Sequence, residues 1–212
     1  MNKCFLSLTI LLLFNSCINI IREVIKLPEP TREGGMPLYE ALNLRKSLRD
    51  FDPSIEVSEE ILSQALWSCY GVREDIYRVV PAAKSWYTYR IFVFLEYGVY
   101  EYNPTDHSLI KYFDGDYREV TGTQKEIVTK AAVKFVFIAD LTMNGRIAED
   151  RKLRREAAKI DIGHSTMALS LFAAANNMKG VVRGNFNEAE IFKFLDLNKE
   201  DHYIPLAFSL GY

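Results

Sequence analysis

The sequence predicts a single α+β domain, and three observations support that fold class. Helix-like and strand-like segments follow one another without the steady βαβ alternation of a doubly wound sheet. The chain has 212 residues, of which 49% are hydrophobic and 25% charged, a composition typical of globular proteins. Its formal net charge of −2 argues against the strongly basic surface of a nucleic-acid-binding protein.

The N-terminus predicts an export signal. Lys3 precedes the apolar run of residues 4–14, which is about half the roughly 20 residues that a membrane-spanning helix requires. The run ends in Asn15-Ser16-Cys17, which resembles a relaxed bacterial lipobox, so residues 1–17 are expected to be a signal peptide with Cys17 as the lipidated residue. Plain secretory cleavage near the same place remains an alternative, because Phe14 replaces the usual Leu or Val. We expect an exported periplasmic or outer-membrane-anchored lipoprotein that contacts the membrane only through its N-terminal lipid.

An extended arm and one folded domain are expected to follow the signal. Residues 18–35 contain two prolines and a glycine pair, which favours a tether, and residues 36–212 form the domain. The periodicity predicts helices over residues 37–45, 59–70, 121–132, 150–178 and 187–195. It predicts strands over residues 89–103 as a hairpin, 108–113, 133–140 and 204–212, with 133–140 central in the sheet. Residues 180–184 are expected to form a strand or a turn.

The helix over residues 150–178 is expected to be central and deeply packed. Its apolar face is predicted from residues at spacings of three and four: Leu153, Ala157, Ile160, His164, Met167, Leu171, Ala174 and Met178.

Several chemistries lack the residues that they need. If Cys4 is removed and Cys17 lipidated, Cys69 is the remaining cysteine, and its apolar surroundings predict a buried structural thiol. The sequence contains no GxGxxG, GxxxxGK[ST], CxxC, HExxH or GxSxG pattern. We therefore expect neither a nucleotide cradle of the Rossmann or P-loop kind, nor a metal site, nor a serine hydrolase.

The stretch LRKSLRDF, residues 44–51, is the clearest candidate for a binding motif. Arg45, Lys46, Ser47 and Arg49 provide two guanidinium forks, an ammonium and a hydroxyl within five residues. Cations in the last turn of a helix also complement the helix dipole and then lie in water, which is the structural alternative. The donor set suits a dianionic phosphate, such as that of a phosphate-bearing cofactor.

Several stretches in order along the whole domain resemble the nitroreductase-like flavoproteins, particularly the exported, SagB/ThcOx-like branch common in Bacteroidetes. The arm with LRKSLRDF resembles the proline arm and basic flavin-phosphate motif of that branch. The other matching stretches are EEILSQALWSCYGV, RVVPAAKSWYTYRIFVF, GVYEYNPTDHSL, DYREVTGTQ and KGVVRGNF.

The resemblance implies a mostly antiparallel sheet flanked by helices in a homodimer with FMN at the interface. It implies that the basic motif holds the phosphate, ribityl chain and pyrimidine edge of FMN, and that residues from the partner subunit line its other side. The latter residues are Pro81, Ala82, Ala83 and Ser85. Arg183 and Gly184 would approach the isoalloxazine, and no side chain is expected to act as an acid or base, because the chemistry takes place at FMN N5.

The chain departs from the family pattern where the isoalloxazine is expected. Ala82 replaces a serine, Ser85 replaces an asparagine, and Met167-Ala168 replace a Gln-Asn pair. Two functions from different classes follow. The first is an FMN-dependent oxidoreductase that moves electrons from an unknown donor to a small conjugated acceptor in the cell envelope. The second is a non-catalytic envelope lipoprotein that keeps the fold as an interaction module. A peptide-azoline dehydrogenase is a third possibility.

Overall fold

The computed structural model describes residues 22–73, 77–124, 129–143 and 150–212. The predicted signal peptide with Cys17 lies outside the described residues, and so does the middle of the predicted helix over 121–132. The helices, including two short 3-10 turns, are α1 (Leu38–Leu44), α2 (Glu59–Tyr70), η1 (Ala83–Ser85), η2 (Arg118–Thr121), α4 (Arg151–Ala175) and α5 (Glu188–Leu195). The strands are β1 (Val24–Lys26), β2 (Tyr89–Leu95), β3 (Gly98–Asn103), β4 (Ser108–Asp114), β5 (Val133–Asp140), β6 (Lys179–Arg183) and β7 (His202–Gly211).

One twisted sheet organises the domain. Its strand order is β1-β4-β3-β2-β5-β7-β6, and each neighbouring pair is antiparallel. All eight residues of β5 are buried, because strands flank it on both sides and side-chain layers cover both faces. The expected α+β class, the hairpins and the central position of residues 133–140 are therefore confirmed.

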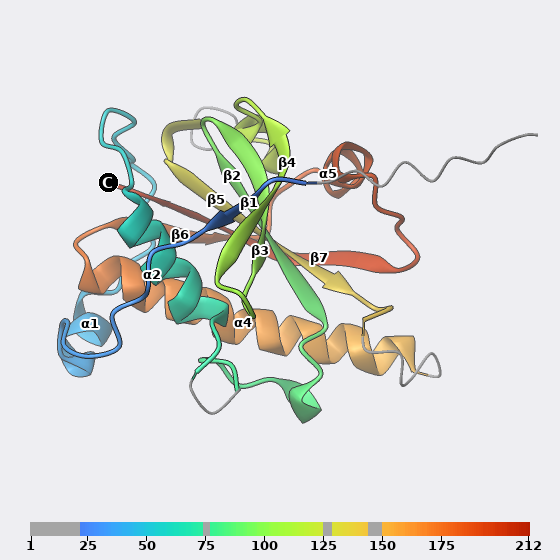
Figure 1. The fold of residues 1–212 in the computed structure, drawn as a ribbon, viewed down its shortest axis with the longest axis horizontal. Coiled ribbons are helices and arrows are strands. Elements are labelled where there is room, and N and C mark those ends of the chain that lie inside the picture. Colours follow the sequence, from blue (N-terminus) through green and yellow to red (C-terminus); the bar gives the residue numbers. More distant parts are fainter. Residues whose placement is uncertain (1–21, 74–76, 125–128, 144–149) are drawn as a thin grey trace, which may run out of the picture.

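Helices cover the two faces of the sheet unequally (Figure 1). On one face, α1, α2 and α4 pack together over a large core that includes Phe135 and Phe137 of β5. On the other face, α5 and η2 cover a smaller core that includes Val136 and Ile138. The alternation of residues along β5 between two cores follows from the two-residue period of a strand.

The ends of α2 follow the sequence signals. The Ser58 side chain accepts a hydrogen bond from the Ile61 N–H, and Glu59 and Glu60 occupy the first turn, where they complement the helix dipole. The helix ends at Tyr70, and Gly71 continues in an extended conformation. This helix presents Leu66 and Cys69 to the core, each fully buried. The expected buried character of the Cys69 thiol is thus confirmed, and burial raises its pKa far above the ordinary value.

The arm expected to be a tether contributes a strand to the sheet. Its residues Val24–Lys26 form β1, which pairs with β4 at the edge of the sheet. Beyond β1 the arm crosses α2, where the Ser63 hydroxyl donates to the carbonyl oxygen of Pro28 at 2.5 Å. The Thr31 N–H donates to Gln64 at 2.7 Å. Nothing in the spacing of the arm predicted the strand, because three residues are too few to show alternation.

His107 connects the arm to the β3–β4 turn. Its Nε2 lies 2.7 Å from the Ser63 Oγ, and its Nδ1 lies 2.8 Å from the Tyr102 hydroxyl. Since Ser63 already donates to Pro28, the histidine must donate from Nε2 and accept at Nδ1 from Tyr102. Desolvation lowers the pKa of His107, in accord with this neutral tautomer.

Helix α4 is central as expected but ends at Ala175, short of the predicted Met178, and its predicted apolar face is buried only in part, at Ala157. Leu153, Ile160 and Met167 are 46%, 62% and 42% exposed. The buried face instead mixes apolar residues with Arg154, Asp161, Ser165 and Thr166. Each of these four side chains hydrogen-bonds protein acceptors or donors, which is why polar residues can face the sheet. The exposed stripe is therefore a second apolar face of the same helix.

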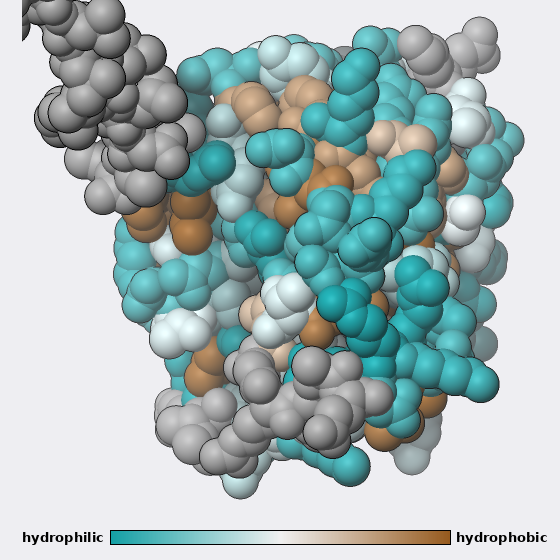
Figure 2. All heavy atoms as spheres, turned by 90° about the vertical axis from the view of Figure 1, so that its right-hand side faces the viewer, coloured by the Kyte–Doolittle hydropathy of each residue, from teal (hydrophilic) through white to brown (hydrophobic). Residues whose placement is uncertain are grey.

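The outer surface is predominantly hydrophilic at the end of the molecule that carries α5. Figure 2 shows this side, where apolar atoms appear in separate patches between hydrophilic side chains. Among the described helices, none is long and apolar enough to cross a membrane.

Candidate functional site

The basic segment, Arg45 to Arg49, follows α1 without regular secondary structure and lies against β6. The N–H of Leu48 donates to the carbonyl oxygen of Gly180 at 3.1 Å. Gly180 has no room for a side chain, because a Cβ there would lie 2.7 Å from the Phe208 ring. The missing Cβ lets β6 approach the core closely, and the sheet thereby holds the basic segment at a fixed position.

The cations of the basic segment are available to an anion. Arg45 is half-buried, whereas Lys46, Ser47 and Arg49 are exposed. Within the part of the chain that the structure describes, no carboxylate forms an ion pair with these three cations. The adjacent acid, Asp50, instead lies 3.2 Å from the Lys179 ammonium. Hydrogen bonds from its own backbone and from Lys179 lower the pKa of Asp50.

Phe51 anchors the end of the segment in the protein. It is 5% exposed and packs with Ala131 and Val181. Its ring centroid lies 5.5 Å from the Nζ of Lys134. Phe51 therefore lies next to a group of basic side chains that come from η2, β5 and β6.

That group, here called the buried basic cluster, consists of Arg118, Lys134 and Arg183 around Ser209. The Ser209 Oγ lies 3.2 Å from Nη1 of Arg183 and 3.3 Å from Nζ of Lys134. Arg183 also donates to the carbonyl oxygen of Thr121. Arg118 is paired with Asp116 at 2.7 Å. Desolvation lowers the pKa of Arg183 to about 10, still well above neutral pH, so Arg183 remains a fixed cation.

Lys134 has the most perturbed environment of the cluster. Its side chain is 0% exposed, and desolvation, together with Arg183 and Arg118, lowers its pKa to about 6. At neutral pH the amine is therefore largely uncharged. The Ser209 hydroxyl oxygen accepts hydrogen bonds from both Arg183 and the Lys134 amine, which keeps N–H donors when it is uncharged. The sequence offered no sign of this, because a single lysine at the start of an apolar strand carries no local signal of its own burial.

The segment Pro81 to Ser85 packs against the middle of α4. The Ala83 N–H donates to both Asp161 carboxylate oxygens, at 3.0 and 3.2 Å. The Pro81 carbonyl oxygen lies 3.2 Å from Nδ1 of His164, which must carry the proton there because a carbonyl only accepts. Sequence reasoning missed Asp161 and His164, because both lie in a helix that was assigned to packing alone.

This segment holds an unusual backbone conformation. Lys84, Ser85 and Tyr87 have φ angles of 49°, 53° and 49°, in the left-handed region that non-glycine residues rarely adopt. Each residue in this conformation destabilises the folded state by roughly 1–3 kcal/mol, and the conformation is retained only where the surrounding structure enforces it. Here Asp161 is 1% exposed, and burial raises the pKa of its carboxyl while the Ala83 N–H acts to lower it. The hydrogen bonds between Asp161 and Ala83 thus fix a strained turn in the segment that was expected to bind the cofactor.

The predicted residues fall into two groups within one chain. The basic segment and Arg183 both lie along β6, and Gly184 follows that strand with nothing within 4 Å of a Cβ built on it. The segment from Pro81 to Ser85 lies at Asp161, about 20 Å along the helix axis from the end of α4. Among the described residues, no hydrogen bond or ion pair joins the two groups. Each group is an ordered part of the fold.

Comparison with known proteins shows which family this chain resembles in sequence and in fold. The sequence profile of the Nitroreductase family matches residues 42–212. A nitroreductase crystal structure from Ralstonia eutropha JMP134 is 32% identical with a TM-score of 0.80, and the match covers 89% of this chain and 88% of that one. A nitroreductase of Methanocaldococcus jannaschii is 26% identical over 172 residues, 76% of this chain and 85% of that protein. A nitroreductase from Desulfovibrio desulfuricans in complex with FMN shares the fold, with 16% identity, a TM-score of 0.60 and 84% and 87% coverage.

Replacing Lys134 should change how stability depends on pH. Between the folded pKa of about 6 and the unfolded value of about 10.4, the unfolded chain holds one more proton than the folded chain. The free energy of unfolding therefore rises with pH in this window, by up to about 1.4 kcal/mol per unit from this group, and loses that dependence below it. We expect Lys134→Met to remove this slope and to stabilise the protein at pH 7 by about 1–4 kcal/mol.

Urea unfolding at several pH values from 5 to 9 measures the effect. Lys130→Met, at an exposed lysine, is the matched control and should retain the wild-type slope. Parallel curves for wild type and Lys134→Met would contradict a neutral, buried amine.

Proposed function

The chain belongs to the nitroreductase family and is an oxidoreductase of that family, and we propose that it uses FMN bound by the basic segment. One observation carries the proposal. Arg45, Lys46 and Arg49 are cations without an acidic partner among the described residues, and the sheet holds them through Leu48 and Gly180. A phosphate needs such a set of free, fixed donors to replace its hydration.

The donor set fits the phosphate end of FMN. Two guanidinium forks and an ammonium would neutralise the dianion, and the Ser47 hydroxyl would donate a further hydrogen bond. The nearby carboxylate does not oppose this, because Lys179 neutralises Asp50.

At the other end of β6, Gly184 and Arg183 would face the flavin ring. The open space around Gly184 would let a planar group approach the backbone there. Arg183 would be a fixed cation beside it, since Ser209 and the Thr121 carbonyl hold its guanidinium. When bound, FMN would supply the hydride- and electron-transfer chemistry at its N5 atom. The contribution of the chain is to bind, orient and provide positive charge.

The segment Pro81 to Ser85 would line the same flavin from a second subunit. Its separation from the basic segment supports this arrangement, because one chain does not bring the two groups into contact. Asp161 and His164 would act as positioning residues that hold the strained turn in place.

A homodimer is proposed on the second apolar face of α4. Leu153, Ile160 and Met167 recur every seven residues and are exposed, and α1 lies beside α4. Helix α1 and the basic segment add further exposed apolar residues: Leu38, Tyr39, Leu42, Leu44 and Leu48. A helix with two apolar faces ordinarily has both faces buried. A second copy of the chain would bury the exposed apolar face of α4.

We place the enzyme in the cell envelope, in the exported branch of the family. The support is the sequence of residues 1–17, with the apolar run and Cys17. The acceptor is proposed to be a small conjugated molecule, and the electron donor would be one available outside the cytoplasm.

A second function, the non-catalytic interaction module, draws support from the departures at the flavin ring. Ala82 offers only a methyl group where a serine is usual, and Met167 belongs to the exposed apolar stripe of α4. Each lost hydrogen bond would cost about 0.5–1.5 kcal/mol of flavin affinity.

Flavin binding should depend on the basic segment. The visible spectrum of the purified protein should show flavin bands, with FMN released on denaturation. Changing Arg45 and Arg49 to Ala together should weaken FMN binding by about a hundredfold or more with the fold intact, because two charge-assisted contacts are lost. The control removes two exposed lysines of the α5 region, Lys193 and Lys199, and should bind FMN like wild type. A colourless protein that takes up no added FMN would favour the interaction module.

The proposed dimer interface can be tested with one charge. Ile160→Glu should convert the dimer to a monomer in light scattering, because an unpaired carboxylate would be buried. Val24→Glu, in β1, is the matched control, since Val24 and Ile160 are both 62% exposed. If both variants stay dimeric, the α4 stripe is not the interface.

Lipidation at Cys17 predicts that Cys17→Ala stops signal processing and membrane association together, measured by mobility on gels and by membrane fractionation. Globomycin should stop the processing of the wild type as well. Normal processing of Cys17→Ala would instead indicate plain secretory cleavage.

A further inference from the structure

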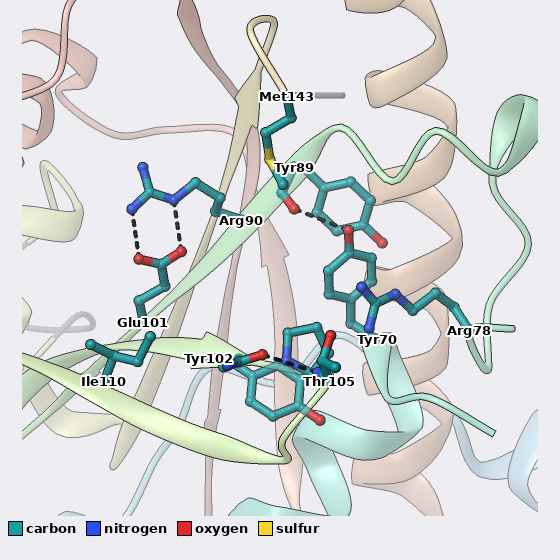
Figure 3. Close-up of a pocket in the computed structure, with 11 residues that line it drawn as sticks. Tyr70, Arg78, Tyr89, Arg90, Glu101, Tyr102, Thr105, Ile110 and Met143 are labelled. Atoms are coloured by element: carbon teal, nitrogen blue, oxygen red, sulfur yellow. Dashed lines mark hydrogen bonds and ion pairs between the residues drawn. The ribbon is translucent and has the colours of Figure 1, made fainter. Parts of the chain in front are cut away.

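A cavity of about 210 Å³ lies at one end of the sheet, between β2, β3, the start of β4 and the C-terminal end of α2 (Figure 3). Its walls are largely aromatic, formed by Tyr70, Tyr89 and Tyr102, with Ile110 and Met143 completing the apolar part. The cavity is smaller than the roughly 300–1,000 Å³ of pockets for drug-sized ligands, so it suits a molecule with one ring. None of its lining residues belongs to the basic segment or to the segment from Pro81 to Ser85.

Most polar groups around the cavity already have partners. The Tyr70 hydroxyl donates to the Tyr89 carbonyl oxygen at 3.0 Å. The Tyr89 hydroxyl lies 2.7 Å from Ser165, and the Tyr102 hydroxyl lies 2.8 Å from His107. These three side chains therefore offer the cavity their ring surfaces and not their hydroxyl groups.

The charged pair in the wall is also satisfied. Arg90 donates to both carboxylate oxygens of Glu101, at 2.7 and 2.6 Å. Tyr112 donates to the same carboxylate at 2.8 Å. The pair adds no net charge to the cavity and offers no free fork to a ligand.

Arg78 is different. Its guanidinium extends toward the cavity in Figure 3 and lies over the Tyr70 ring at 4.6 Å and the Tyr87 ring at 5.1 Å. These contacts hold the guanidinium plane in one orientation. Its Nη1 is shielded from solvent, yet it has no hydrogen-bond partner in the described part of the chain. A buried donor without an acceptor is costly, and native proteins normally supply a partner, either protein, water or ligand.

From these observations we propose that the cavity is a second binding site, for a small planar carboxylate with one aromatic ring. The carboxylate accepts hydrogen bonds from Arg78, and the ring lies among the three tyrosine rings. A carboxylate fits better than a phosphate, because one free guanidinium balances a single negative charge, whereas a dianion needs several donors. The exposed Thr105 of the β3–β4 turn lines the same cavity and marks its open side.

The test uses benzoate and its neutral isostere benzamide, titrated into the purified protein by calorimetry. Wild type should bind one benzoate per chain at least about tenfold more tightly than benzamide, because a charge-assisted contact is worth that factor. Arg78→Met should bind the two equally. Arg73→Met is the matched control, since Arg73 is exposed and lies outside this cavity, and it should keep the preference for benzoate.

Two outcomes would overturn the proposal: no preference for benzoate in wild type, or an unchanged preference in Arg78→Met. If Arg78→Met fails to fold by circular dichroism, Arg78→Lys replaces it, because lysine keeps a cation over the Tyr70 ring but loses the planar fork. Its preference for benzoate should fall several-fold, and a wild-type preference would reject the site. Flavin-free protein serves equally well, so the result does not depend on FMN binding.

Discussion

The carboxylate of Asp161 is the interaction on which the arrangement of the candidate site depends. It is buried in the middle of α4, on the side that faces the sheet, and it accepts from the backbone of Ala83. Ser165, one turn further along, donates to the Cys69 carbonyl oxygen at 2.6 Å and contacts the Tyr89 hydroxyl. Arg154, at the start of the helix, donates to the Leu141 and Met143 carbonyl oxygens. The long helix thus fixes two loops and the end of α2 through polar contacts, in a layer where apolar packing would leave backbone groups unpaired.

Much of the fold could be predicted because local and global preferences agree. Three segments show this agreement: the apolar run of β5, the Ser58 cap of α2 and the aromatic hairpin of β2 and β3. The local sequence of each favours a single structure, and the fold contains that structure. Helix α4 shows the limit. Its spacing identified a helix with an apolar face, but the sequence could not say which of two faces meets the sheet. The polar residues that do so are acceptable only because partners distant in the chain satisfy them.

The candidate site shows the same limit. The basic segment was recognisable from its residue types alone, since its function would rest on local donor chemistry. Lys134, Asp161 and Arg78 were not, because each acquires its character from neighbours far along the chain. Lys134 becomes a neutral amine through burial beside Arg183, and Arg78 has a buried, unpartnered donor where its guanidinium packs against two tyrosine rings. Such properties belong to the tertiary environment and leave no local pattern.

The incorporation of the arm into the sheet has a geometric consequence for a lipid-anchored protein. Six residues, 18–23, separate Cys17 from Val24, where β1 begins. An extended chain of that length reaches about 25 Å at most. With Cys17 acylated, the tether would be too short for the domain to move far from the bilayer. The β1–β4 edge of the sheet would then face the membrane. Because the tether is short, the domain could react only with acceptors that diffuse within or close to the lipid surface.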